Sequence, residues 1–248
     1  MTVNKPNKQA DARAKEQVDP SASPDRKTLL EETLRRRIIS MELPPGGVID
    51  ELSLSKEFGL SRPPVRELMR ELAAEGYIEL EANRPARVSS MNYQSMRSFF
   101  QAAPLIYIAT TQLAATHATP ADIENLQAIQ SNFKDAMERD DTIERVHYND
   151  LFHFEIGKIA RNAYLMPSLR RLLIDHARLG NTFYRSPTTD DMKSDMEKAV
   201  QQHDQIINAI ANHDADAAAE LIREHWELSR RRMAEYVMPD GVEIPLSF

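Results

Sequence analysis

The sequence predicts a mainly helical protein with two parts: an N-terminal winged helix-turn-helix with a small β-wing, and a C-terminal all-helical bundle. Three features predict this fold class. Residues 50–70 contain two short helical patterns separated by a turn. Two short segments of alternating polarity follow at residues 77–80 and 86–89, which is typical of strands. From residue 91 to 238 apolar residues recur at helical spacing, without any strand pattern.

Composition limits the class of protein. The chain has 248 residues, which suffices for one large or two modest domains. It has no cysteine, so disulfides and thiolate chemistry are excluded. No apolar run approaches the roughly 18 residues that span a membrane, and the polar N-terminus lacks the apolar core of a signal peptide. We therefore expect a cytoplasmic protein with no membrane partner.

The net charge of −7 is unevenly distributed. Residues 1–95 hold 15 lysine and arginine residues against 15 aspartate and glutamate residues, whereas the remainder holds 16 against 23. The acidic excess therefore lies in the second part, while the arginines of the balanced first part are clustered. This distribution disfavours wrapping of DNA by the whole protein.

The N-terminal part begins with a predicted disordered tail over residues 1–25, which are polar and lack apolar periodicity. A helix is predicted over 26–41, and the proline- and glycine-rich residues 43–47 end it. The winged helix-turn-helix domain is expected to cover 26–90.

The helix-turn-helix itself lies in residues 50–70. Gly59 offers a left-handed conformation at the end of the first helix, and Ser61 is predicted to cap the second. Pro63 and Pro64 fall in the first turn of that second helix, where their missing N–H groups cost little.

Three arginines of the second helix, Arg62, Arg66 and Arg70, are spaced four residues apart and so share one helix face. A solvated arginine face explains such a row as well as a polyanion site does. The wing that follows favours the polyanion, because this is the geometry of a helix that enters the DNA major groove. Guanidinium groups there grip phosphates or bind guanine edges.

The predicted wing connects residues 77–80 to 86–89. Asn83 tolerates the positive φ that a hairpin tip needs. Arg84 and Arg87 flank the tip and are placed for phosphate or minor-groove contact; the alternative is a solvated turn.

Residues 29–88 resemble the N-terminal winged helix-turn-helix of the GntR family of bacterial transcription regulators. The matching motifs are LRRRIISMELPPG at 34–46, FGLSRPPVRE at 58–67 and LAAEGYI at 72–78. The resemblance implies that five positions of this segment contact operator DNA. These are Ser61, Arg62, Pro63, Pro64 and Arg66.

The C-terminal domain, expected over 91–238 and followed by a tail at 239–248, is predicted to be a six-helix bundle. The candidate helices are 93–117, 120–139, 142–160, 166–185, 191–212 and 215–237. Pro104 should bend or interrupt the first of them. This half resembles the effector-binding and dimerisation domain of the FadR subfamily, chiefly through NDLFHFEIGKIARN at 149–162 and the segment 203–225.

A divalent metal site is predicted at Asn149, His153, His203 and His225. Asn149 and His153 share a helix face, and neutral imidazoles are common ligands of Zn and Ni. Taken singly, a helical histidine is more often surface or satisfied core. The resemblance raises the expectation, because many FadR-type members carry an Asp and three His at these positions. Asn149 departs from that pattern and is a weaker ligand, whereas Asp150 would point away by about 100°.

The effector is expected to be a small molecule, and a carboxylate is one candidate. Relatives often carry Arg and Glu on the first bundle helix, where this chain has Gln101 and Leu105. Arg171 and Arg178 on a later helix are candidates to replace the missing arginine.

These features predict a ligand-responsive transcription regulator rather than an enzyme. The resemblance to the GntR family implies that it acts as a repressor, and we expect it to bind a near-palindromic double-stranded DNA operator as a homodimer. A metal-dependent hydrolase that uses the three histidines is the first alternative, but no HExxH pattern is present and Glu155 would face away from His153. A regulator with a lapsed effector pocket is the second alternative.

Overall fold

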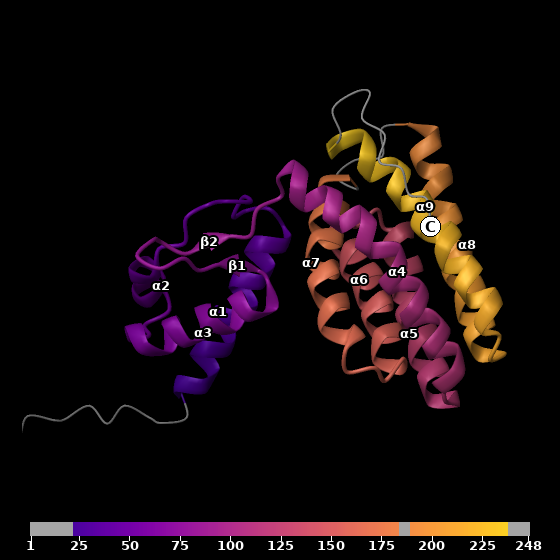
Figure 1. Ribbon diagram of the computed structural model, residues 1–248, viewed down its shortest axis with the longest axis horizontal. Helices are drawn as coiled ribbons and strands as arrows, with labels where there is room; N and C mark the ends of the chain where they lie inside the picture. Colours follow the sequence, from indigo (N-terminus) through magenta and orange to yellow (C-terminus); the bar gives the residue numbers. More distant parts are fainter. Residues whose placement is uncertain (1–21, 184–188, 238–248) are drawn as a thin grey trace, which may run out of the picture.

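The computed structural model describes residues 22–183 and 189–237. The described residues form two bodies that lie side by side (Figure 1). The N-terminal body contains α1 (Ala22–Ile39), α2 (Glu51–Glu57), α3 (Arg62–Glu75), β1 (Ile78–Glu79) and β2 (Arg87–Val88). The C-terminal body contains α4 (Tyr93–His117), α5 (Pro120–Glu138), α6 (Thr142–Ile159), α7 (Leu165–Phe183), α8 (Asp190–Ala211) and α9 (Ala215–Val237). The mainly helical fold with a small β-wing is confirmed.

The core of the N-terminal body forms where α1 packs on α3. Leu30, Leu34 and Ile38 are fully buried on the inner face of α1, against a cluster that includes Val65 and Leu68 of α3. Helix α1 begins at Ala22, so residues 22–25 are helical although they were expected in the tail. It ends at Ile39 rather than at residue 41, because Met41 adopts a left-handed conformation with φ of 63°. The rest of the predicted N-terminal tail and the tail at 239–248 lie outside the described residues.

The wing is shorter than predicted. Ile78 pairs with Val88 and Glu79 pairs with Arg87 in an antiparallel hairpin of two-residue strands. Val48 forms an additional bridge to Arg87, so the loop after α1 extends the small sheet. Asn83 has a φ of 61°, as the predicted hairpin tip requires.

In the C-terminal body α4 packs mainly against α9 and α6. Of the two outcomes expected at Pro104, a bend or an interruption, the interruption does not occur: α4 continues through Pro104, which is buried in the middle of the helix. A buried proline costs a helix roughly 3 kcal/mol, and the packing of α4 on its neighbours offsets that cost. The α5 start is confirmed: the Thr119 side chain accepts a hydrogen bond from the Asp122 N–H, and the Asp122 carboxylate accepts one from the Thr119 N–H.

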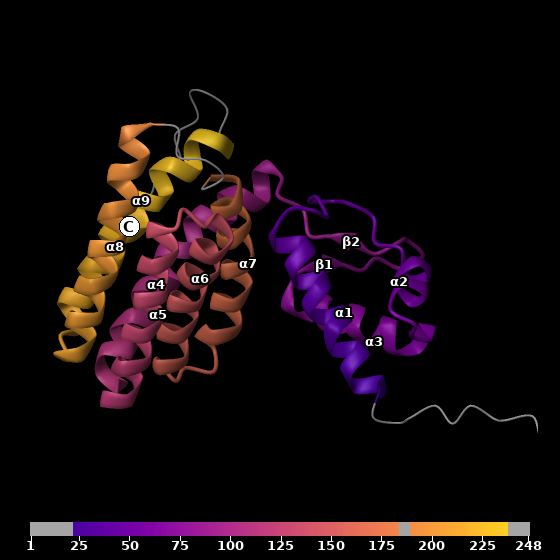
Figure 2. The same ribbon diagram turned by 180° about the vertical axis from the view of Figure 1, so that it is seen from behind.

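Helix α7 packs on α1 and α3 of the N-terminal body, and Figures 1 and 2 show it on the side of the bundle that faces that body. Arg178 Nη1 donates to the Ser89 carbonyl at 3.2 Å, and its Nη2 donates to the Tyr77 carbonyl at 3.4 Å. Asn181 donates to the Ile39 carbonyl at 3.1 Å. Among the described helices, none is both long and apolar enough to cross a membrane.

Candidate DNA-binding surface and histidine cluster

Helix α3 exposes the face that the sequence singles out. The side chains of Arg62, Arg66 and Arg70 are exposed, whereas Val65 and Leu68 on the other side of the helix are buried. The buried residues anchor α3 in the body and leave the arginine row on its surface.

The N-terminus of α3 has unoccupied hydrogen-bonding groups. Ser61 is the N-cap residue, as predicted, but its side chain makes no capping hydrogen bond. Pro63 is exposed and Pro64 is partly buried in the first turn. Pro63 and Pro64 have no N–H group, so the Ser61 hydroxyl is the group at this helix start that is suited to donate to an anion such as phosphate.

Arg66 is not free in this state. Its Nε lies 3.0 Å from Glu51 Oε2 at the start of α2, and both groups are partly exposed. An exposed pair of this kind contributes only about 0–1 kcal/mol. A phosphate or a base can therefore replace Glu51 as the partner of Arg66 at little cost.

The wing arginines have different surroundings. Arg84 is exposed at the tip and pairs with Glu81 at 2.5 Å. Arg87 Nη1 donates to the Gly46 carbonyl at 2.8 Å, so this guanidinium also holds the loop after α1. Asn83 is exposed and immediately precedes Arg84 in the sequence.

The bundle brings together three of the four predicted metal ligands. His153 of α6, His203 of α8 and His225 of α9 are all buried, and one ligand atom from each lies within 4.8 Å of the others. The Nε2 atoms of His203 and His225 are 3.3 Å apart. His153 Nε2 is buried without a hydrogen-bond partner.

Two glutamines orient these imidazoles. Gln130 Oε1 lies 3.0 Å from His203 Nδ1, and Gln202 Oε1 lies 3.1 Å from His225 Nδ1. An amide oxygen only accepts hydrogen bonds, so each Nδ1 carries the proton and each Nε2 presents a lone pair. The Gln130 amide is itself held by donation to the Val200 carbonyl at 2.9 Å.

The cluster is electrically neutral near pH 7. Burial lowers the pKa of His225 to about 3 and that of His176 to about 4. Burial also holds the pKa values of His153 and His203 well below their usual range, and the neighbouring histidines lower them further. Neutral imidazole is the form that binds a metal ion.

His176 of α7 belongs to the same cluster and was not predicted. Its ring centroid lies 5.4 Å from that of His153, and its Nδ1 lies 2.9 Å from the Tyr107 hydroxyl. Its apolar sequence neighbours indicate burial, but nothing in the sequence indicates that α7 brings it to His153. Gln130 and Gln202 likewise carry no sequence signal, because their roles depend on which helices pack together.

Asn149, the fourth predicted ligand, and its sequence neighbour Asp150 point in different directions from α6. Asn149 is half-buried, one turn before His153 on α6. Asp150 does not belong to the cluster of ligand atoms that His153 forms. It lines a cavity between the two bodies, and burial raises its pKa to about 7.

The three residues proposed for effector binding have separate locations. Gln101 is exposed on α4. Arg171 is 40% exposed and pairs with Asp175 at 2.9 Å. Arg178 is fully buried and binds the backbone of the N-terminal body and Asp175. The structure therefore places Arg178 in the contact between the bodies.

Comparison with known proteins agrees with this architecture. Residues 27–88 match the gntR family of bacterial regulatory proteins, and residues 100–228 match the FCD domain family. The HTH-type transcriptional repressor RspR of Escherichia coli (strain K12) is 26% identical over 196 residues, which cover 78% of this chain and 82% of RspR. The galactonate operon transcriptional repressor of the same strain is 25% identical over 224 residues, covering 82% of this chain and 94% of that protein.

The fold is similar to that of McbR/YncC from E. coli. The two structures superpose with a TM-score of 0.72 at 16% identity, over 85% of this chain and 98% of McbR/YncC. Both relatives are named as transcriptional repressors. With a winged helix-turn-helix in front of an FCD domain, the chain belongs to the GntR family of bacterial transcription regulators.

Proposed function

We propose that this protein is a ligand-responsive repressor that binds a near-palindromic operator as a two-fold homodimer. In this proposal α3 lies in the major groove of each half-site, and the histidine cluster holds a divalent cation that takes part in effector binding. The observation that carries the DNA-binding part is the exposed N-terminal half of α3. The unbonded Ser61 hydroxyl and the row of Arg62, Arg66 and Arg70 are open to solvent there.

The names of two relatives, both repressors, support repression rather than activation. Two copies of a helix-turn-helix that bind half-sites one helical turn apart explain why an operator of this class is near-palindromic. The exposed wing residues Asn83 and Arg84 would add contacts beside the groove, and Arg87 would keep the wing attached to the Gly46 loop.

The histidine cluster fits a divalent cation. Two nitrogen ligands about 2.05 Å from a tetrahedral Zn ion lie about 3.3 Å apart, and the His203 and His225 Nε2 atoms have a separation of 3.3 Å. Both atoms present lone pairs, so they repel each other unless a cation or proton lies between them. His153, with its unpartnered Nε2, would complete a three-histidine set. Zn or Ni is the ion of choice for such ligands.

Three protein ligands leave at least one coordination position for another group. We infer that a small effector, such as a carboxylate, occupies it, with Asn149 as a neutral neighbour. FCD domains bind small-molecule effectors, and a ligand regulates DNA binding if its affinity differs between two arrangements of the dimer.

DNA binding is tested by selecting bound fragments from a genomic library and footprinting the selected operator. We expect Arg66→Ala to weaken operator binding by about 1–3 kcal/mol if Arg66 reads a base, with little change for random DNA. A uniform, salt-sensitive loss on all sequences would restrict Arg66 to phosphate contact. Arg139→Ala removes the same charge from an exposed site of the bundle and should leave binding unchanged. Light scattering of the free and bound protein checks the dimer.

Elemental analysis of the purified protein tests the cation. We expect near-stoichiometric metal in the wild type, loss of metal in His153→Ala/His203→Ala, and retained metal in the exposed control His147→Ala. Absence of metal from the wild type, even after addition of Zn or Ni, would reject the cation and direct the search to effectors that need none.

A further inference from the structure

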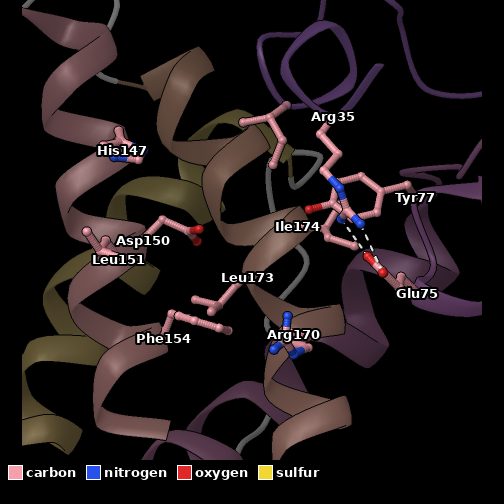
Figure 3. A pocket seen from close by; sticks show the side chains of 11 residues that line it. Arg35, Glu75, Tyr77, His147, Asp150, Leu151, Phe154, Arg170, Leu173 and Ile174 are labelled. Atoms are coloured by element: carbon pink, nitrogen blue, oxygen red, sulfur yellow. Dashed lines mark hydrogen bonds and ion pairs between the residues drawn. The ribbon is translucent and has the colours of Figure 1, made fainter. Parts of the chain in front are cut away.

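A cavity of about 220 Å³ lies between the N-terminal body and the bundle. One side is formed by α1 and the segment from α3 to β1, and the other by α6 and α7. Figure 3 shows the side chains that line it. They include Arg35, Tyr77, Asp150, Phe154, Leu173 and Ile174.

Asp150 is the unusual residue of this cavity. In Figure 3 its carboxylate points from α6 into the space beside Leu173 and Ile174. Its Oδ1 atom is shielded from solvent and has no hydrogen-bond partner. A buried carboxyl oxygen without a hydrogen-bond partner is unfavourable, so a ligand that supplies a donor would be stabilised at this position.

Arg35, one of the two arginines that line the cavity, already has partners. Arg35 lies 2.8 Å from Glu31 and 2.5 Å from Glu75, and its guanidinium stacks on the Tyr77 ring at 4.7 Å. The two glutamates more than neutralise Arg35. Arg35 therefore does not serve as a counter-ion for Asp150.

Arg170, the other cation of the lining, is exposed and lies over the Phe154 ring at 4.6 Å. It occupies the solvent side of the cavity, where water screens its charge. The inner end therefore favours a group that donates hydrogen bonds, such as an ammonium group, because the Asp150 Oδ1 atom lacks a partner there.

Apolar side chains form another part of the lining, beside the polar groups of Glu75 and His147. Leu151, Phe154, Leu173 and Ile174 come from the bundle, and Ile39 comes from α1. The volume equals the share of about seven liquid water molecules at roughly 30 Å³ each. A small molecule with an apolar body and one positively charged end fits both the size and the polarity.

We propose that this cavity is a second ligand site, which binds a small primary amine with its ammonium group on Asp150 and its apolar body between Phe154 and Tyr77. The site is separate from the histidine cluster, since Asp150 is not among the grouped ligand atoms of His153, His203 and His225. It thus goes beyond the cation and effector of the proposed function.

The position of the site gives the amine a route to regulation. Its lining comes from both bodies, so a bound amine contacts Tyr77 on one side and Asp150 on the other. Binding therefore stabilises the arrangement of the two bodies seen here relative to any other arrangement. The amine should change operator affinity in proportion to its preference for this arrangement.

Calorimetric titration of the full chain with 2-phenylethylamine tests the site. 2-Phenylethanol serves as the uncharged probe of equal size, and phenylacetate as the anionic probe. The titrations use metal-free protein without DNA, so their outcome does not depend on the proposed cation or operator. We expect saturable binding of the amine and weaker binding of the alcohol and the anion.

Two variants locate the amine. Asp150→Asn keeps the shape of the side chain and should weaken amine binding roughly tenfold or more, which is the loss expected for a hydrogen bond to a charged group. Ile39→Phe adds bulk on the N-terminal side of the cavity while Asp150 is unchanged, and it should weaken all three probes. Asp135→Asn removes one exposed carboxylate elsewhere in the bundle and should have no effect.

Circular dichroism of each variant checks that it folds. Equal amine affinity of wild type and Asp150→Asn would overturn the proposal. Tighter binding of phenylacetate than of the amine, or no saturable binding of the amine at millimolar concentration, would also overturn it.

Discussion

At the scale of single residues, hydrogen-bond partners determine what each functional side chain presents to a ligand. The three buried histidines are chemically alike. In His203 and His225, however, the Nε2 atom presents a lone pair, because Gln130 and Gln202 accept a hydrogen bond from the Nδ1 atom. In the same way Glu51 holds Arg66 on the surface of α3 in the free protein.

Gln202→Leu should weaken metal binding. Without the amide oxygen, His225 loses the partner that selects its tautomer, and loss of such an outer partner typically costs about 10–100-fold in metal affinity. Competition titration of Zn against a chromophoric chelator measures the change. Gln127→Leu alters an exposed glutamine of α5 and should bind Zn like the wild type. Equal Zn affinities of the two variants would show that Gln202 does not support the proposed cation site.

Glu51→Gln should strengthen operator binding by about 0.2–1 kcal/mol, which is the range of an exposed ion pair. The substitution releases Arg66 and removes a carboxylate from the surface that faces phosphate. Glu57→Gln is the matched control on the same helix, because Glu57 pairs with Arg37 instead. Fluorescence anisotropy with labelled operator measures both affinities. Weaker operator binding by Glu51→Gln than by the wild type would instead show that Glu51 itself contacts the DNA.

At the scale of elements, the ends of α3 determine how the DNA-binding helix sits in the molecule. Its N-terminus is open, as a ligand site requires, whereas its C-terminus is closed by Gly76 with φ of 94°. The Gly76 N–H donates to the carbonyls of Leu72 and Ala73, which are among the last acceptors of the helix.

Gly76→Ala should destabilise the N-terminal body. The left-handed backbone alone costs about 1–2 kcal/mol, and a steric clash of the new Cβ with Arg171 adds to this cost. A Cβ at Gly76 would come within 2.2 Å of Arg171 Cδ, so Arg171 has to move away from Asp175. Gly46→Ala has a similar φ of 73° but meets no atom within 4 Å. Thermal unfolding should therefore show a larger decrease in melting temperature for Gly76→Ala than for Gly46→Ala. Equal decreases would mean that the Arg171 side chain moves aside without destabilising the protein.

At the scale of the whole molecule, α7 sets how the DNA-binding body meets the bundle. Arg178 is fully buried and donates to backbone carbonyls of Tyr77 and Ser89 on either side of the wing. In the proposed regulation, the hydrogen bonds of Arg178 to the wing backbone would transmit ligand binding in the bundle or in the interdomain cavity to the DNA-binding body.

Arg178→Met should loosen the junction. It removes the donors to both carbonyls while Asp175 keeps Arg171 as a partner. Breaking a buried pair of this type costs about 3–5 kcal/mol. Small-angle scattering should show a larger radius of gyration, and the exposed control Arg139→Met should not change it. An unchanged radius would show that other contacts suffice to hold the two bodies.

The sequence by itself determined the features that depend on local periodicity. Helical spacing placed Leu30, Leu34 and Ile38 on one buried face of α1 and Arg62, Arg66 and Arg70 on one exposed face of α3. Capping chemistry located helix starts such as that of α5 at Thr119. These predictions hold because hydrogen bonds and side-chain directions within one helix involve residues only three or four apart. Pro104 shows the limit, since tertiary packing carried α4 through it.

Only the tertiary structure decided which distant side chains meet. It brought His176 and the amides of Gln130 and Gln202 to the predicted histidines. It also placed Arg178 in the junction between the two bodies and Asp150 in the interdomain cavity. The physical reason is that these partners lie on different helices, and the burial that makes each contact strong exists only after those helices have packed together.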